Sequence, residues 1–411
     1  MDMNKITIRE LIILFVLILF IFQNLLEKYF VYAQYIDEIV ALLFLIHYFL
    51  RVVLNKSISK KFSRLVLLLL TIILITLISN FWNNVQTNIL IISIDLFSIF
   101  KFIFIFLGAQ SFLNDLTHKE IKRIILRVYF ISNIYLSVLI VLAFLNIFIG
   151  LGMHQEYRYG LPTFSFIFGT PGQVINLSII FLLLYQLNKL YNSKNNLIHL
   201  VLIFLLLLST LKTRAIVLAI VFVYILYLFE IRNISSMKKR VLPVLGLGAV
   251  VGFEQFKTYF LTSDTPRLTL FKYGMLTMRR YFPLGSGFAT YGSDIAAKNY
   301  SLLYYQYGFH NRYGMNPYDI RFLNDNFYPM IFAQFGFLGG ILYVFLLLDY
   351  FRLLLRVASI NDKVIKTSVF IYIFNVVLSS IQSSYPGTNS MVITTFLICL
   401  ILRYSDKWRI L

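Results

Sequence analysis

Cysteine and charged residues are both scarce in this sequence of 411 residues. The single cysteine, Cys399, excludes a disulfide within the chain and a thiolate cluster around a metal ion. Charged residues make up 13% of the chain and hydrophobic residues 59%, gathered in runs that reach the roughly 17 to 25 residues of a membrane-spanning helix. The sequence therefore predicts an all-α polytopic membrane protein, with one helical bundle surrounded by the bilayer.

The sequence motifs of soluble enzymes are missing as well. There is no phosphate-binding loop, no G-x-S-x-G, no HExxH and no CxxC. The histidines show no metal-ligand spacing, and they are His47, His118, His154, His199 and His310. We therefore expect neither a metal site nor a cofactor.

Positive charge is in excess, with a formal net charge of +19. In a soluble protein this excess would suggest a nucleic-acid partner, but in a membrane protein most of it marks the cytoplasmic loops. We therefore expect the bilayer, and no nucleic acid, as the partner of these charges.

The apolar runs predict twelve transmembrane helices. Their ranges are 10–27, 38–54, 64–82, 88–107, 125–150, 172–188, 196–211, 214–230, 240–257, 328–349, 364–382 and 388–404. The first resembles a signal peptide without a small-residue cleavage site, so we expect it to be retained. The chain then divides into nine helices in 1–256, a partly helical extracytoplasmic loop of roughly 70 residues in 257–327, and three helices in 328–411.

The connecting loops sort by charge. Four of them, 51–64, 119–127, 232–240 and 352–366, are rich in Lys and Arg. In the predicted order of helices these four loops share one side with both termini, which makes that side cytoplasmic.

Two segments on the opposite side are basic against this rule. One is the turn in LLLLSTLKTRAIVLAI, which holds Lys212 and Arg214. The other is the loop 257–327, with eight Lys or Arg against four Asp. Cations kept on the outer side suggest an anionic ligand there.

The long loop is predicted to be ordered. The sequence Ser263-Asp264-Thr265-Pro266 is typical of a helix start, and the helix would run toward Pro283. A second short helix is predicted from Ser293. An apolar stripe on the first helix indicates that it lies on the bundle or on the membrane surface, and it consists of Leu270, Phe271, Met275 and Met278.

Tyrosine is concentrated in this loop. Eleven of the 28 tyrosines lie between Tyr259 and Tyr328. Aromatic faces stack on sugar rings, but tyrosine also gathers at membrane interfaces, so both interpretations stay open.

The candidate site residues are polar groups on the predicted outer side. Guanidinium groups bind phosphate oxygens, and a nearby carboxylate can take a proton from a hydroxyl, so together they would suit a diphosphate substrate. The candidates are Arg158 in the shorter outer loop, Arg214, Arg267, Arg279, Arg280, His310, and Asp325 with Asn326 before the tenth helix.

Simpler interpretations exist for several of these residues. Lys212 and Arg214 could extend to the membrane interface, and Arg279 with Arg280 could be favourable charges at a helix C-terminus. Asp325 could cap the tenth helix. Within the fourth helix, Asp95 and Lys101 are six residues apart and do not share a helical face, so we expect separate partners for them.

Several segments resemble the O-antigen polymerase and O-antigen ligase superfamily, which includes the capsular and exopolysaccharide polymerases called Wzy. They are LSTLKTRAIVLAI, TPRLTLFKYGMLTMRRYFPLGSGFATYGS and NDNFYPMIFAQFGFLGG, together with the long outer loop between the ninth and tenth of twelve helices. The turn would be Pro283, Gly285, Gly287 and Thr290, and the helix signature Gln334, Gly336 and Gly339.

The resemblance implies a metal-independent, inverting glycosyltransferase of the bacterial cytoplasmic membrane. It would transfer a glycan from undecaprenyl diphosphate to an acceptor on the outer face, in concert with a flippase and a chain-length regulator. By position, Arg214 and Arg267 would hold the donor diphosphate, and Asp325 would act on the acceptor hydroxyl.

Two departures from the family pattern narrow this expectation. Asp325 stands where ligases have a histidine, which favours a polymerase with a lipid-linked repeat unit as acceptor and leaves His310 as a competing base. Gln334 replaces the usual Glu. The alternatives are a ligase to another acceptor and a flippase, although the sequence shows neither the repeats nor the broken helices of a transporter.

Overall fold

Helices make up most of the described chain. The computed structural model describes residues 7–55, 60–193, 196–231, 257, 265–358 and 362–405. Eleven of the twelve predicted helices are found there, and the predicted ninth, 240–257, lies mostly outside the described residues. They are α1 (Ile8–Leu26), α2 (Ile36–Asn55), α3 (Lys60–Asn83), α4 (Ile89–Leu113), α5 (His118–Phe148), α6 (Pro171–Asn192), α7 (Leu197–Ser209), α8 (Thr213–Leu226), α13 (Phe327–Ala358), α14 (Lys363–Gln382) and α15 (Asn389–Leu402).

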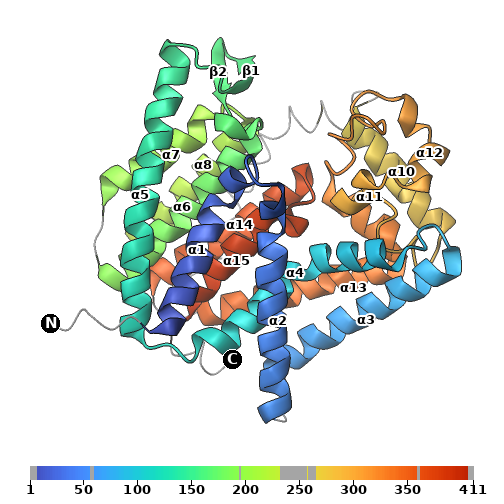
Figure 1. The fold of residues 1–411 in the computed structure, drawn as a ribbon, viewed down its shortest axis with the longest axis horizontal. Coiled ribbons are helices and arrows are strands. Elements are labelled where there is room, and N and C mark those ends of the chain that lie inside the picture. Colours follow the sequence, from blue (N-terminus) through green and yellow to red (C-terminus); the bar gives the residue numbers. More distant parts are fainter. Residues whose placement is uncertain are drawn as a thin grey trace.

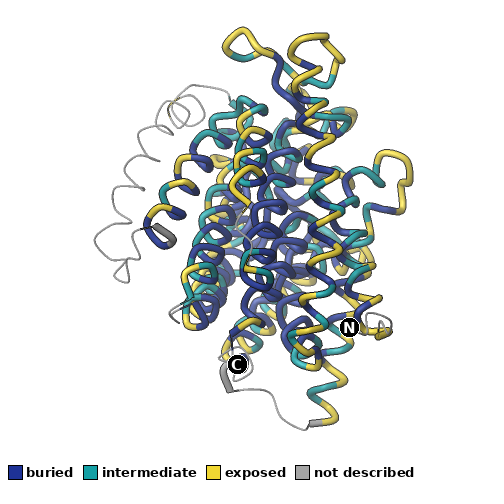
Figure 2. Tube along the Cα trace, turned by 90° about the vertical axis from the view of Figure 1, so that its left-hand side faces the viewer, coloured by how far each residue is buried: buried dark blue, intermediate teal, exposed yellow. Residues whose placement is uncertain are grey.

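Seven helices of the described chain are long and apolar enough to cross a membrane by length and composition, namely α1, α3, α4, α5, α6, α13 and α14. The apolar helices α7, α8 and α15 are shorter. Figure 2 shows buried residues along the centre of the bundle and exposed ones on its outer helices. This architecture fits a multi-pass membrane protein, and the number of twelve spans stays a prediction.

A two-stranded antiparallel sheet interrupts the helices. Strand β1 (His154–Arg158) pairs with β2 (Leu161–Phe164), and Arg158 lies opposite Leu161. The two residues between them, Tyr159 and Gly160, have φ of 53° and 77°, as a tight hairpin turn requires. The predicted shorter outer loop is therefore a hairpin.

The ends of the helices gather in two groups, as the alternating order predicts. Arg123 near the start of α5 pairs with Glu10 near the start of α1, and Arg51 near the end of α2 pairs with Asp115 beyond α4. The Arg403 Nε beyond α15 donates to the Leu113 carbonyl at 2.8 Å. Figure 1 shows this end below and the hairpin and α11 above. Which side of a membrane each end faces stays a prediction.

Residues 265–326 form a small folded unit, which we call the cap. It contains α10 (Pro266–Arg280), α11 (Asp294–Lys298), α12 (Leu302–Gln306) and the 3-10 helix η5 (Phe309–Asn311). Thr265 caps α10 with Pro266 in its first turn, and Ser293 caps α11, so both predicted helix starts are confirmed. The cap has its own core, with Leu270, Tyr291, Tyr304, Phe309 and Leu323 in it. Part of the tyrosine enrichment is therefore structural.

The predicted apolar stripe of α10 is not its packed face. Only Leu270 of the stripe is buried, beside Thr269, Gly274 and Thr277. The small Gly274 lets α10 approach α13, because a Cβ there would lie 2.7 Å from the Pro329 Cβ. Phe271 stays 42% exposed.

Helix α13 is broken at Gly336, which contradicts the expectation of unbroken helices. Gly336 has φ 66° and ψ −166°, a conformation that is essentially restricted to glycine. The backbone groups on both sides of the break pair with the turn 283–287 of the cap. The Gly287 N–H donates to the Gln334 carbonyl at 2.9 Å, and the Leu338 N–H donates to the Pro283 carbonyl at 3.2 Å.

Polar side chains of α3 and α4 hold the other side of this turn. Asn83 Nδ2 donates to the Gly285 carbonyl at 2.9 Å. Asn80 accepts from the Phe288 N–H at 2.7 Å and donates to its carbonyl at 3.1 Å, and buried Asp95 accepts from the Ala289 N–H at 2.6 Å. Because unpaired polar groups are costly inside a membrane protein, these bonds fix the cap on the bundle.

We predict that Gly336→Ala lowers the stability of the protein by about 3 kcal/mol or more. The new methyl group would lie 2.2 Å from the Gly285 nitrogen and would force a residue other than glycine into a positive φ. Thermal unfolding in detergent measures the change. Gly172→Ala is the control, since a Cβ there meets nothing within 4 Å. Equal melting temperatures for the two variants would contradict the tight junction.

Candidate functional site

The candidate site begins at the short turn between α7 and α8. Leu211 has φ 52° at this turn, and α8 starts at Thr213. The guanidinium of Arg214 therefore projects from the first turn of α8, where it donates to the Asn176 amide oxygen of α6 at 2.9 Å and to the Ser379 hydroxyl of α14.

A chain of hydrogen bonds continues from Arg214 into α14. The Ser379 hydroxyl donates to the Asn375 amide oxygen at 3.1 Å. The Asn375 Nδ2 donates in turn to the Tyr385 hydroxyl at 2.8 Å, in the buried 3-10 helix η6 (Tyr385–Gly387). This network holds Arg214 in one orientation, as a preorganised binding group requires.

Arg267 and Asp325 meet at the end of the bundle. Arg267 lies in the first turn of α10 and Asp325 just before α13, and their Nη2 and Oδ2 atoms are 3.5 Å apart. Their side chains are 16% and 25% exposed, so both remain accessible from outside the protein. The neighbouring Asn324 carbonyl accepts from the Ser384 N–H at 3.1 Å and from its hydroxyl at 2.9 Å, which fixes this segment beside η6.

The electrostatics of this cluster favour an anion beside a titratable carboxyl group. The positive charges of Arg214 and Arg267 are close enough to repel each other. Burial raises the pKa of Asp325 to about 6, although the charges of Arg267 and Lys212 act in the opposite direction. An anion between the two guanidinium groups would relieve their repulsion.

Lys212 has a partner that the sequence interpretation did not include. Its ammonium group donates to Glu156 Oε1 of β1 at 2.6 Å, and Arg158 Nε donates to the same oxygen at 2.8 Å. Burial acts to raise the pKa of Glu156, but the hydrogen bonds and charges of the two cations lower it overall. This ion cluster ties the hairpin to the start of α8, so Lys212 does not simply extend to the interface.

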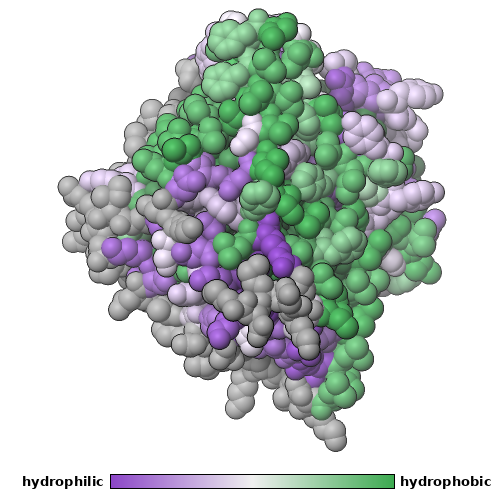
Figure 3. Space-filling model, turned by 60° about the vertical axis from the view of Figure 1, so that its left-hand side comes forward, coloured by the Kyte–Doolittle hydropathy of each residue, from purple (hydrophilic) through white to green (hydrophobic). Residues whose placement is uncertain are grey.

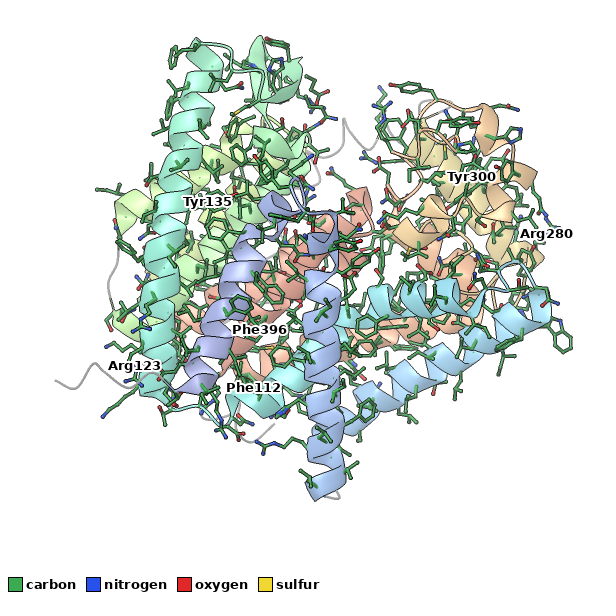
Figure 4. The ribbon with its side chains drawn as sticks, viewed as in Figure 1. Phe112, Arg123, Tyr135, Arg280, Tyr300 and Phe396 are labelled. Carbon is green, nitrogen blue, oxygen red and sulfur yellow. The ribbon has the colours of Figure 1, made fainter. Side chains whose placement is uncertain are left out.

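Of the other predicted site residues, Arg158 belongs to this ion cluster. Arg279, Arg280 and His310 lie elsewhere, on the cap. Arg279 and Arg280 end α10, about 18 Å along its axis from Arg267. Figure 4 shows Arg280 at the outer edge of the cap, and its guanidinium donates to Gln306 at 2.9 Å. His310 is exposed, and its ring packs against the Tyr305 ring with centroids 5.6 Å apart. Their predicted role in substrate binding stays a prediction.

The positions of Asn326 and Gln334 indicate structural roles for both residues. Asn326 is buried, at 4% exposure, and directly precedes the first residue of α13. The capping position of α13 is therefore Asn326, and Asp325 lies one residue earlier. Gln334 Nε2 donates to the Tyr291 carbonyl of the cap at 2.8 Å, so it has a structural partner.

The charges within α4 have separate partners, as predicted. Lys101 forms ion pairs with Asp37 and Glu38 of α2, whereas Asp95 accepts from the Ala289 N–H of the cap. Asp95 therefore belongs to the junction between cap and bundle.

Four residues of the site were not among the candidates that the sequence indicated. They are Glu156, Asn176, Asn375 and Ser379. An available signal was the presence of Asn176 and Asn375 inside apolar helices, because polar residues within membrane helices are functional candidates. No local sequence pattern predicts that Glu156 pairs with Lys212, because the two residues are 56 positions apart.

Among the described residues, no group of three or more His, Cys, Asp or Glu is arranged to hold a metal ion. Comparison of the chain with family models, curated proteins and solved structures finds no match in any of the three.

We predict that Ser379→Ala lowers the stability by about 1 to 3 kcal/mol, because Asn375 and Arg214 each lose a buried hydrogen bond. Ser380→Ala is the control, since within the described part of the chain that buried hydroxyl bonds just the Val376 carbonyl of its own helix, at 2.7 Å. Thermal unfolding in detergent compares the two. A Ser379→Ala protein as stable as Ser380→Ala would argue against the network.

Proposed function

We propose that this protein is a polysaccharide polymerase that extends a lipid-linked glycan at the outer face of a bacterial cytoplasmic membrane. The donor would be the growing chain on undecaprenyl diphosphate, and the acceptor a lipid-linked repeat unit. The observation that supports this most is the meeting of Arg214, Arg267 and Asp325, which come from segments far apart in the sequence.

The proposed reaction is a direct displacement at the anomeric carbon. A hydroxyl oxygen of the acceptor sugar attacks that carbon, the bond from the carbon to the diphosphate oxygen breaks, and the configuration is inverted. Asp325 takes the hydroxyl proton, and undecaprenyl diphosphate leaves with the electron pair of the broken bond.

The two guanidinium groups would stabilise the leaving diphosphate. They present charge-assisted donors at a boundary of low dielectric, where such bonds are strong. Around them, Arg158, Lys212, Arg214 and Arg267 outnumber the carboxylates Glu156 and Asp325, which suits a ligand with several negative charges.

The separation between Arg267 and Asp325 suits both roles. At 3.5 Å the contact is long for a charge-assisted hydrogen bond, so a diphosphate can take over the guanidinium while Asp325 turns to the acceptor. With the raised pKa of Asp325, the carboxylate is a stronger base than an exposed one.

We expect Arg214→Gln and Arg267→Gln each to reduce polymerisation about 100-fold or more, and Asp325→Asn by a similar factor. The measurement is polymer formed by the full chain in proteoliposomes supplied with lipid-linked repeat units. Arg321→Gln is the matched control, because Arg321 is 58% exposed on the cap and pairs with Asp319.

The amount of folded protein must be equal across these variants, as judged by gel filtration and thermal unfolding. If Asp325→Asn retains full activity, Asp325 is not the base. In cells lacking the gene, single repeat units should accumulate on the outer leaflet. Full-length lipid-linked chains would indicate a ligase instead, and repeat units trapped inside a flippase.

The pH dependence of the rate tests the role of Asp325 independently. A general base must be deprotonated, so activity should rise as the pH rises through about 6. Lys212→Gln should move the midpoint to higher pH, since the Lys212 charge lowers the pKa of Asp325. Arg267→Gln should move it further, measured on the residual activity, because the Arg267 charge acts more strongly.

Arg321→Gln should leave the midpoint unchanged. If the rate of Asp325→Asn still falls at low pH with the same midpoint, another group takes the proton. His310 is then the first residue to test.

A further inference from the structure

The outward face of α10 combines cations with apolar residues. Lys272, Leu276 and Arg279 follow one another at spacings of four and three, so they share one side of the helix. Leu276 is 47% exposed, and Phe271, on a neighbouring side of the same helix, is 42% exposed. Lys272, Leu276 and Arg279 lie opposite the buried Leu270, Gly274 and Thr277, of which Gly274 meets Pro329 of α13.

The charge on this helix has one sign only. The segment Pro266–Arg280 contains Arg267, Lys272, Arg279 and Arg280 and no acidic residue. Lys272 and Arg279 border a groove of about 340 Å³ that Tyr273, Met275 and Leu276 also line. A groove lined by two cations and by apolar and aromatic side chains suits a group with a phosphate attached to hydrocarbon.

The C-terminal end of α10 adjoins an apolar surface of α13, one of the helices long enough to cross a membrane. Phe282, 65% exposed just beyond α10, packs on Phe337 of α13 with ring centroids 6.0 Å apart. Leu338 and Phe345 of α13 are exposed as well, at 45% each. The cationic end of α10 thus lies where a surface suited to lipid tails begins.

Exposed aromatic side chains also lie at the end of α3, next to the turn that follows α10. Phe81 and Trp82 are 64% and 81% exposed, and the adjacent Asn83 donates to the Gly285 carbonyl of the turn that follows α10. Exposed aromatic residues gather at the boundary between hydrocarbon and water. On the other side of the molecule, which Figure 3 brings forward, extended hydrophobic surface also adjoins patches of hydrophilic residues.

We propose that the face of α10 with Lys272, Leu276 and Arg279, together with Arg280, Phe282 and Trp82, lies in the headgroup region of the bilayer and binds anionic phospholipid. The apolar residues enter the upper part of the hydrocarbon, and the three cations contact lipid phosphates. This would hold the cap against the membrane, and it does not rest on the proposed enzymatic activity.

The test uses the full chain with one tryptophan in the proposed contact. Leu276→Trp is combined with Trp82→Phe and Trp408→Phe, and the protein is reconstituted in phosphatidylcholine vesicles. The vesicles contain an equal small fraction of either brominated phosphatidylglycerol or brominated phosphatidylcholine. Because bromine quenches tryptophan only at short range, the fluorescence reports which lipid lies beside α10.

We expect both lipids to quench Trp at position 276, with brominated phosphatidylglycerol quenching at least about twofold more strongly, since each cation favours an anionic surface about fivefold. Adding Lys272→Gln, Arg279→Gln and Arg280→Gln should remove this preference. Lys298→Gln with Arg321→Gln, exposed cations elsewhere on the cap, should leave it intact.

Three results would overturn the proposal. Absence of quenching by either lipid would mean that the face meets water or protein. Equal quenching by both lipids would remove the anionic preference, and a preference that survives the triple substitution would assign it to other residues.

Discussion

The junction between the cap and the broken helix α13 determines where the candidate site residues lie. At Gly336 the helix gives up its regular backbone hydrogen bonds, and the turn 283–287 supplies new partners on both sides of the break. Both backbones approach so closely that a Cβ on either Gly285 or Gly336 would overlap the other. A broken membrane helix is tolerated when neighbouring protein satisfies the freed groups, and here the cap does so.

The same junction accounts for polar residues that would otherwise be costly in the bundle. Asn80, Asn83 and Asp95 lie on α3 and α4, and each one pairs with the cap backbone between Gly285 and Ala289. The same stretch of the cap is thereby hydrogen-bonded to α3 and α4 as well as to α13. Since α10 and the segment before α13 both belong to this attached unit, Arg267 and Asp325 are presented at a fixed place above the bundle.

Two further contacts complete the setting of the site. Arg214 is fixed by α6 and α14, and Lys212 joins the hairpin to α8 through Glu156. The site therefore draws on the bundle, the hairpin and the cap at once. Such convergence of separate rigid elements allows charges of equal sign to be held close together, where an anionic ligand gains the most from them.

Eleven helices of the described chain follow from the sequence, because hydrophobic period and capping residues act locally. Local charge likewise identifies the basic segments and makes Arg214, Arg267 and Asp325 candidates. The three-dimensional packing, in contrast, was needed to show that α13 breaks at Gly336, that Asp95 accepts from the Ala289 N–H of the cap and that Lys212 pairs with Glu156. These features join residues tens to hundreds of positions apart. Their pairing follows from how the elements pack, which no local pattern of residues encodes.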